Sequence, residues 1–183
     1  MNWKNSKTRY GTASIGLHWL MLLLLAAVYA CMELRGIYPK GSALRDGIKA
    51  WHYMLGLSVF GLVWLRIGLQ LLGASPEIKP AAPKWQMRFA LLMKLSLYAL
   101  MIAMPLLGWS ILSAEGKPIP YFFGLQLGAL IGENKALGLQ IQEVHQTFGK
   151  VGYFLIGLHA VAGLYHHYIR RDNVLLRMLP SRA

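Results

Sequence analysis

Acidic side chains and cysteines are scarce in this chain of 183 residues. Seven Asp and Glu stand against nineteen Lys and Arg, and Cys31 is the single cysteine. One cysteine excludes a disulfide framework within the chain, and no Cys/His spacing typical of a zinc site is present. At this length one domain is expected. A disulfide-stapled fold and a thiolate metal site are therefore both excluded.

Apolar residues, in contrast, are abundant, at 56% of the chain. This share is typical of a membrane protein rather than of a soluble domain. Four apolar segments are long enough to cross a bilayer, which takes about 20 residues each, and each has to be helical because a lone span must pair its own backbone in lipid. The sequence predicts an all-α transmembrane four-helix bundle. It is expected to form one membrane domain (1–183), with helices at about 14–33, 50–72, 89–112 and 144–169.

The basic residues flank these spans, and this pattern indicates orientation in a bilayer rather than nucleic-acid binding. Four spans place both termini on one side of the membrane. The tails and the second connection are rich in Lys and Arg, whereas the other two connections mix bases with acids. By the positive-inside rule we expect both termini in the cytoplasm.

Two further segments have to be distinguished from spans. The letters VYAC, ending at Cys31, are similar to a lipoprotein cleavage signal, but the apolar run before them is long for a signal peptide, so we expect the first span to be retained. The third connection contains YFFGLQLGALIG, which is apolar but too short to cross a bilayer. We expect this piece to be interfacial or re-entrant on the outer face.

The histidines are the candidate chemical groups, because an ionisable side chain inside a span is costly and usually functional. His145 and His159 are fourteen residues apart in the fourth span. This spacing is about four helical turns, so both lie on nearly one face and differ in depth by about 21 Å. His52 enters the bilayer level with His145, and His18 lies in the same half of the bilayer as His159.

Each pair at matched depth can clamp one flat metal macrocycle between two helices. Haem iron accepts imidazole on both faces, and helical bundles commonly hold such cofactors. Ordinary interhelical hydrogen bonding is the alternative for any single histidine, and a zinc site fits less well because it needs three or four converging ligands. Gly56, Gly149 and Gly163 each follow one of these histidines by four residues. At those positions a missing side chain would leave room for a large ring, although small residues also serve helix packing.

The chain resembles the bacterial cytochrome b561 family of small di-haem membrane cytochromes. The resemblance is carried by IGLHWL around His18, MELRGIYP at 32–39, WHYMLG around His52, and the long block VHQTFGKVGYFLIGLHAVAGLYHHYIRRDNVLLRM at the C-terminal end. It implies two haem b groups, one held by His18 and His159 and the other by His52 and His145. It also implies a bacterial inner-membrane location.

The best-understood member of that family resembles a superoxide:ubiquinone oxidoreductase. The resemblance therefore implies superoxide as donor at the outer face and ubiquinone as acceptor, with the position of His166 at the quinone site. Superoxide is an anion, and a basic surface raises the rate at which an anion arrives. The candidate steering residues are Arg35, Lys40, Arg45 and Lys49, and an ordinary solvated loop is the alternative for them.

Two other functions remain open from the residues alone. One is a haem-b electron conduit or membrane anchor for a separate dehydrogenase, which implies a soluble redox partner. The other is a small non-redox membrane protein, which would be colourless when purified. His167 has no assigned role. The basic residues after it, Arg170 and Arg171, are expected first to end the fourth span on the cytoplasmic side, with pairing to haem propionates as the alternative.

Overall fold

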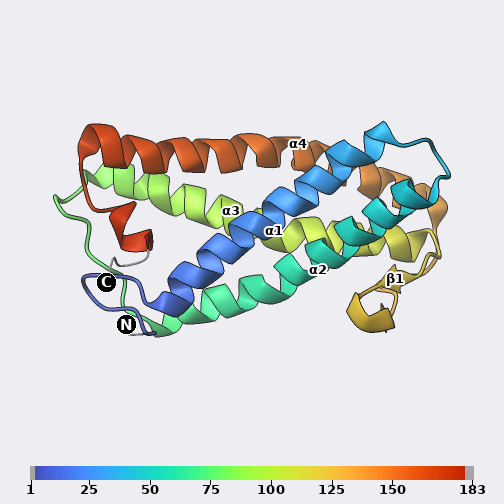
Figure 1. Cartoon of the computed structure of the whole chain (residues 1–183), viewed down its shortest axis with the longest axis horizontal. Helices are drawn as coiled ribbons and strands as arrows, with labels where there is room; N and C mark the ends of the chain where they lie inside the picture. The colour runs from blue at the N-terminus through green and yellow to red at the C-terminus, as the bar shows by residue number, and fades with distance from the viewer. Residues whose placement is uncertain (1–2, 180–183) are drawn as a thin grey trace.

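The computed structural model describes residues 3–179, so both ends of the expected 1–183 unit lie outside the described residues. Four long helices run along the molecule (Figure 1). Their bounds are α1 Thr12–Leu34, α2 Ala43–Leu72, α3 Lys84–Ala114 and α4 Lys135–Tyr165. The beginning of α1 and the end of α4 lie at one end of the molecule, which we call the terminal end. The opposite end carries the α1–α2 connection, and we call it the loop end.

All four helices are long and apolar enough to cross a membrane. The predicted all-α, four-span fold is confirmed. Two helices begin well before their predicted first residues: α2 begins at Ala43 rather than at residue 50, and α4 at Lys135 rather than at residue 144. In each case a capping side chain, Ser42 or Asn134, accepts a hydrogen bond from a main-chain amide of the first turn, at 3.4 Å and 3.0 Å. Such caps start a helix in polar sequence, where apolar periodicity gives no signal.

The helices pack in the order in which they follow one another in the chain. The close backbone approaches join α1 to α2, α2 to α3, and α3 to α4. In contrast, α4 makes few close backbone approaches to α1 or α2. The bundle is therefore an arc of helices in which α4 faces α1 and α2 across a wider separation than it faces α3.

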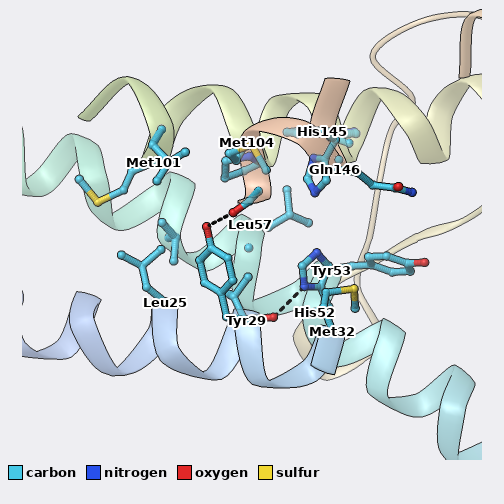
Figure 2. Close-up of a pocket in the computed structure, with 18 of the residues that line it drawn as sticks. Leu25, Tyr29, Met32, His52, Tyr53, Leu57, Met101, Met104, His145 and Gln146 are labelled. Atoms are coloured by element: carbon cyan, nitrogen blue, oxygen red, sulfur yellow. Dashed lines mark hydrogen bonds between the residues drawn. The ribbon is translucent and has the colours of Figure 1, made fainter. Parts of the chain in front are cut away.

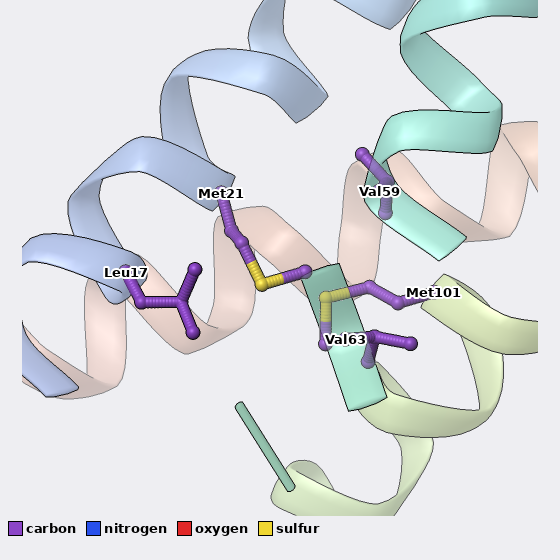
Figure 3. Close-up of a cluster of buried hydrophobic side chains, with 5 residues drawn as sticks. All are labelled: Leu17, Met21, Val59, Val63 and Met101. Atoms are coloured by element: carbon purple, nitrogen blue, oxygen red, sulfur yellow. The ribbon is translucent and has the colours of Figure 1, made fainter. Parts of the chain in front are cut away.

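A small apolar core lies near the middle of the bundle. Its buried members come from α1, α2 and α3, and Val63 is fully inaccessible to solvent. Figure 3 shows the thioethers of Met21 and Met101 turned toward each other within this cluster. The other members are Leu17 and Val59. Along α2 the core residues lie between His52 and Arg66, so the core separates the two halves of the bundle.

The third connection forms a short hairpin at the loop end (Figure 1). The antiparallel strands are β1 (Ile119–Pro120) and β2 (Gln126–Leu127), with a 3-10 turn between them. The hairpin reaches α2, where the Tyr121 and Ser58 hydroxyls are 3.3 Å apart. Phe123, at its tip, has a φ of 60° and is fully exposed. The apolar piece predicted to be interfacial or re-entrant is thus a hairpin beside α2.

At the terminal end, the chain continues beyond α4 as a π-helical turn, His166–Arg170, and a 3-10 turn, Leu176–Met178. This segment folds back toward the beginning of α1, where the indole N–H of Trp19 donates to the carbonyl of Met178 at 2.8 Å. The guanidinium of Arg177 is buried and donates to the carbonyl of Pro76. The segment therefore ties α4 to α1 and to the α2–α3 connection.

Candidate functional site: two facing histidine pairs

Two pairs of histidines face each other across the separation between α4 and its neighbours. At the loop end, His145 of α4 faces His52 of α2, as Figure 2 shows. At the terminal end, His159 of α4 faces His18 of α1. The ring centroids are 6.2 Å apart in both pairs. The pairing predicted from depth is the pairing that the helices bring together.

This separation is the one that a single metal ion between two imidazoles requires. A metal–imidazole bond is about 2.0–2.1 Å, and the ring centroid lies about 1.1 Å behind the nitrogen, so two opposed ligands have centroids about 6 Å apart. Two rings in direct hydrogen-bond contact would be closer. Within residues 3–179, no group of three or more His, Cys, Asp or Glu side chains is placed to hold a metal ion. The geometry therefore favours a metal held by two histidines, with its other ligands supplied by a macrocycle.

A cavity of about 320 Å³ lies at the loop-end pair. This volume falls in the range of small-molecule and cofactor sites. All four helices line it, and β1 adds Ile119. Its wall is mostly apolar, with leucines, valines and three methionines around the two imidazoles, and Pro105 of α3 among them. A flat, largely apolar ring fits a cavity of this composition.

The ring of His52 is held in one tautomer. Its Nδ1 lies 3.0 Å from the carbonyl oxygen of Val28 on α1, shown as a dashed line in Figure 2. A carbonyl only accepts, so Nδ1 carries the proton and the lone pair of Nε2 is free. Metal-binding histidines usually donate their second N–H in this way. His52 is therefore oriented to bind a metal ion through Nε2.

His145, the other ring at this end, is buried by α3. Its Nδ1 has no well-formed hydrogen bond to any residue in 3–179, although the main-chain carbonyl of Met104 interacts with the ring. Gly108 of α3 leaves room for the imidazole, because a Cβ there would lie 3.4 Å from its Cε1. A buried imidazole without a firm partner is available as a ligand.

The terminal-end pair has a different neighbour. Nη2 of Arg66, on α2, lies 2.9 Å from Nδ1 of His18. A guanidinium only donates, so Nδ1 accepts and the neutral ring carries its proton on Nε2. In this arrangement His18 presents no bare nitrogen to a metal. Binding through Nε2 requires Arg66 to move to an acceptor of its own, and a carboxylate is its natural partner.

The three predicted glycines all have open surroundings. A Cβ at Gly56 or Gly163 would meet no atom within 4 Å, and at Gly149 it would meet only Met104 Cε at 3.7 Å. Gly56 and Gly149 line the loop-end cavity, whereas Gly163 does not. The closer approach is at Gly152, where a Cβ would overlap the hydroxyl of Tyr29. Gly152 is thus the residue that lets α1 and α4 meet in the middle of the bundle.

The predicted steering residues have different surroundings. Arg35 lines the cavity at the loop-end pair, and Lys40 is exposed. The guanidinium of Arg45 donates to the carbonyls of Arg35 and Tyr38 at 3.0 and 2.8 Å, which closes the connection. Lys49 pairs with Asp46 at 2.8 Å. Arg35 and Lys40 are therefore the two whose charges are uncommitted to a carboxylate or a carbonyl among the described residues.

Further charges surround this end. Lys150 of α4 lines the same cavity, together with Glu33 of α1. The carboxylate of Glu33 accepts a hydrogen bond from the hydroxyl of Tyr153 at 2.6 Å. Outside the spans, Lys117 pairs with Glu115 at 2.8 Å, and this hydrogen bond raises the pKa of Lys117. The cavity rim thus carries two cations, Arg35 and Lys150, against one carboxylate.

His166 lies in the π-helical turn at the terminal end, seven residues beyond His159. Its Nδ1 is 2.5 Å from Oδ2 of Asp172. His167, its neighbour, contacts the ring of Tyr168 and has no hydrogen bond within the described residues. Arg66 and Asp172 were not predicted from the sequence as site residues, although they bond to His18 and His166. The signal for Arg66 was available, since it is a charged residue inside an apolar span.

The family model of prokaryotic cytochrome b561 matches residues 9–181 of the chain. The chain belongs to the prokaryotic cytochrome b561 family. It is 41% identical to "Cytochrome b561 homolog 1" of Escherichia coli (strain K12) over 174 residues, 95% of this chain and 98% of the relative. It is 34% identical to "Probable superoxide oxidase CybB" of Yersinia pestis over 174 residues, covering 95% of this chain and 97% of the relative. "Cytochrome b561 homolog 2" of E. coli (strain K12) is 27% identical over 184 residues, with 98% and 95% covered.

The match confirms the predicted family and the membrane electron-transfer class. The cytochrome b561 family binds haem b in a helical bundle, and this chain is a multi-pass membrane protein. The described residues fit that cofactor on two independent observations. The ring separations suit one metal ion per histidine pair, and the loop-end cavity is apolar and of ligand size.

Proposed function

We propose that this cytochrome b561 protein transfers electrons from superoxide to ubiquinone through two haem b groups, in the bacterial inner membrane. The observation that carries the proposal is the pair of facing histidines in each half of the bundle, with one ring separation of 6.2 Å in both. Both termini, and with them the terminal end, would lie on the cytoplasmic side of the membrane. The loop end would then face outward.

His52 and His145 would hold the outer haem, and His18 and His159 the inner haem. Each haem would supply one-electron redox chemistry, tuned by its axial imidazoles and by burial. The Val28 carbonyl fixes the tautomer of His52 for this role. Gly56 and Gly149 keep the wall of the outer site free of side chains. When haem binds, the Arg66 guanidinium would leave Nδ1 of His18 and pair with a haem propionate carboxylate instead. His18 would then be free to bind the iron.

Superoxide would arrive at the loop end. Arg35 and Lys150 on the cavity rim, with Lys40 nearby, provide the positive potential that attracts an anion. Arg45 and Lys49 would act less directly, because their charges are engaged by carbonyls and by Asp46. The similarity to a relative named as a probable superoxide oxidase supports this donor.

Ubiquinone would bind at the terminal end near His166. Quinone reduction needs protons as well as electrons, and an imidazole can deliver a proton to a quinone oxygen. The overall reaction balances as two superoxide anions, one ubiquinone and two protons giving two O₂ and one ubiquinol. We expect His166→Ala to slow ubiquinone reduction and to leave both haems in place. Loss of a haem in this variant would make His166 a ligand instead.

A second candidate function is a haem-b conduit that serves a separate dehydrogenase. It shares the two histidine pairs but requires a soluble donor at one end. Co-purification of such a donor, together with failure to react with superoxide, would favour it.

The deciding experiment uses the purified haem-loaded protein in detergent. A haem-to-protein ratio near two and a reduced-minus-oxidised spectrum of b-type haem test the cofactors. Superoxide generated enzymatically should then drive reduction of ubiquinone-1, and the rate should fall as ionic strength rises, because salt screens the rim cations. No superoxide-dependent ubiquinone-1 reduction by a protein that carries both haems would rule out the proposed donor–acceptor pair.

A further inference from the structure

The carboxylate of Asp172 is completely buried beside His166. Its side chain is 0% exposed, that of His166 is 17% exposed, and Oδ2 lies 2.5 Å from Nδ1. Within residues 3–179, Asp172 is the single acidic residue in the buried class. A buried carboxylate without a partner is strongly unfavourable, so the His166 imidazole is needed to compensate the charge of Asp172.

The main chain holds Asp172 firmly in this place. Its amide donates to the carbonyl of His166 at 3.2 Å, and Oδ1 accepts the amide of Val174 at 3.0 Å. The next residue, Asn173, bonds to the α2–α3 connection through the carbonyl of Glu77 and the amide of Lys79. Both carboxylate oxygens are thus engaged, and the segment that carries them is anchored to another part of the fold.

This contact decides which imidazole nitrogen is available to a ligand. An ionised carboxylate only accepts, so Nδ1 of His166 carries a proton that is donated to Oδ2. Nε2 is left as the nitrogen that can meet a ligand, and no described residue bonds to it. The turn is π-helical, a geometry that is frequent at functional sites. Nε of Arg170, in the same turn, is also buried without a hydrogen-bond partner among residues 3–179.

We propose that Asp172 is the positioning residue for His166 in ubiquinone binding and protonation. The inference rests on the proposed acceptor and deepens it. Asp172 holds the imidazole with Nε2 toward the quinone oxygen and stabilises the imidazolium from which the proton leaves. Nε2 donates one proton for each electron that the quinone accepts and regains it from cytoplasmic water. Asp172 stays ionised and takes up no proton, as in other carboxylate–histidine pairs.

Asp172→Asn tests this with little change of shape. The amide oxygen still accepts from Val174, but the amide nitrogen now donates to Nδ1, so the ring is held neutral with its one proton on Nε2. A neutral N–H is a weaker donor to a quinone oxygen than an imidazolium, and the imidazolium has lost its counter-ion. In the haem-loaded protein, we expect binding of ubiquinone-1 to weaken and its reduction to slow by about 10–100-fold, the usual effect of losing a carboxylate that orients a functional histidine. Asp172→Glu should recover part of the loss.

The matched control is Glu77→Gln. This carboxylate lies on the α2–α3 connection to which Asn173 is bonded, pairs with Lys79 at 3.5 Å and is 62% exposed. Its loss should therefore leave ubiquinone-1 binding unchanged. In a His166→Ala background, Asp172→Asn should have no further effect, because a positioning residue acts only through its histidine. The haem spectrum of every variant checks that the bundle is intact.

The outcomes separate the two proposals. Wild-type protein with both haems that neither binds nor reduces ubiquinone-1 overturns the proposed acceptor, and the role of Asp172 with it. Wild-type binding with Asp172→Asn indistinguishable from Glu77→Gln overturns the inference about Asp172 alone. The inference would also be overturned if Asp172→Asn slowed ubiquinone-1 reduction as much in the His166→Ala background as in the wild type. Asp172 would then act by stabilising the fold rather than through His166.

Discussion

The two histidine pairs have the same ring separation but differ in the hydrogen bond that one ring of each pair makes. At the loop end, His52 donates to the Val28 carbonyl and opens onto an apolar cavity. At the terminal end, His18 accepts from Arg66 in the half of the bundle that holds the buried Asp172. Helix packing alone sets the distance between two rings. The neighbour of each ring sets its tautomer and so its readiness for a metal.

The difference in charge between the two ends also affects the direction of electron transfer. A positive charge beside a redox centre favours the reduced form of that centre. Arg66 interacts with both histidines of the terminal-end pair, His18 and His159, whereas at the loop-end pair Arg35 interacts with His52 alone. With haem at both pairs, as proposed, this charge favours electron transfer from the loop end toward the terminal end. That is the direction from an external donor to a quinone on the cytoplasmic side.

The largest effect on this comparison should come from removing one ligand at a time. We expect His145→Ala to lose the loop-end haem and His159→Ala to lose the terminal-end haem, so that each haem-to-protein ratio falls from two to one. The two variants should keep different haems, which electron paramagnetic resonance of the oxidised proteins distinguishes. Loss of both haems in either variant would contradict two independent sites.

A side chain in the loop-end cavity should have the next largest effect. Gly56 lines the cavity, and a Cβ there meets no atom within 4 Å, so Gly56→Leu adds a side chain at the cavity wall with room for its Cβ. We expect haem content to fall by up to one per chain at unchanged helix content by circular dichroism. Gly61→Leu is the control, because Gly61 is an exposed residue of the same helix with equally open surroundings. An equal loss of haem in the control would place the effect outside the cavity.

The smallest effect should come from the charge at the terminal end. We expect Arg66→Gln to lower the midpoint potential of the terminal-end haem by tens of millivolts and to leave that of the loop-end haem in place, because a nearby cation favours the reduced state. Arg66→Lys keeps the charge and should restore most of the potential. Redox titration of the two haems provides the measurement. An equal shift at both haems would mean that Arg66 does not distinguish the two ends.

The sequence was sufficient to predict the four membrane helices and which histidines face each other. Helical periodicity puts His145 and His159 on one face, and span order puts His52 and His18 at their depths. Those arguments depend only on regular helices in a bilayer of known thickness. The confirmed four-helix membrane fold follows from hydropathy, and helix geometry accounts for which histidines face each other; their role as haem ligands stays a prediction.

Side-chain contacts that depend on the shape of a turn, on a helix cap or on the rotation of one helix against another were not predictable in this way. The bond between Asp172 and His166 depends on a π-helical turn, and that between Arg66 and His18 depends on how α1 rotates against α2. The early starts of α2 and α4 depend on Ser42 and Asn134, whose capping role lies outside the apolar pattern. Tyr29 and Gly152 meet across the bundle with no signal in either local sequence.

The arc of helices has a consequence for biogenesis. Each helix packs on the one made just before it, so the contacts of α1 to α4 can form in the order of synthesis, from the N-terminus onward. The approach of α4 to α1 and α2 is different, because it runs through side chains rather than through close backbone packing. Tyr29 donates to the carbonyl of Gly149, Tyr153 donates to Glu33, and the two histidine pairs face each other. With haem at both pairs, as proposed, cofactor binding would complete this side of the bundle after α4 has been made. In a cell short of haem, α4 would stay packed on α3 but would be held less firmly to α1 and α2, and so would be more open to membrane proteases.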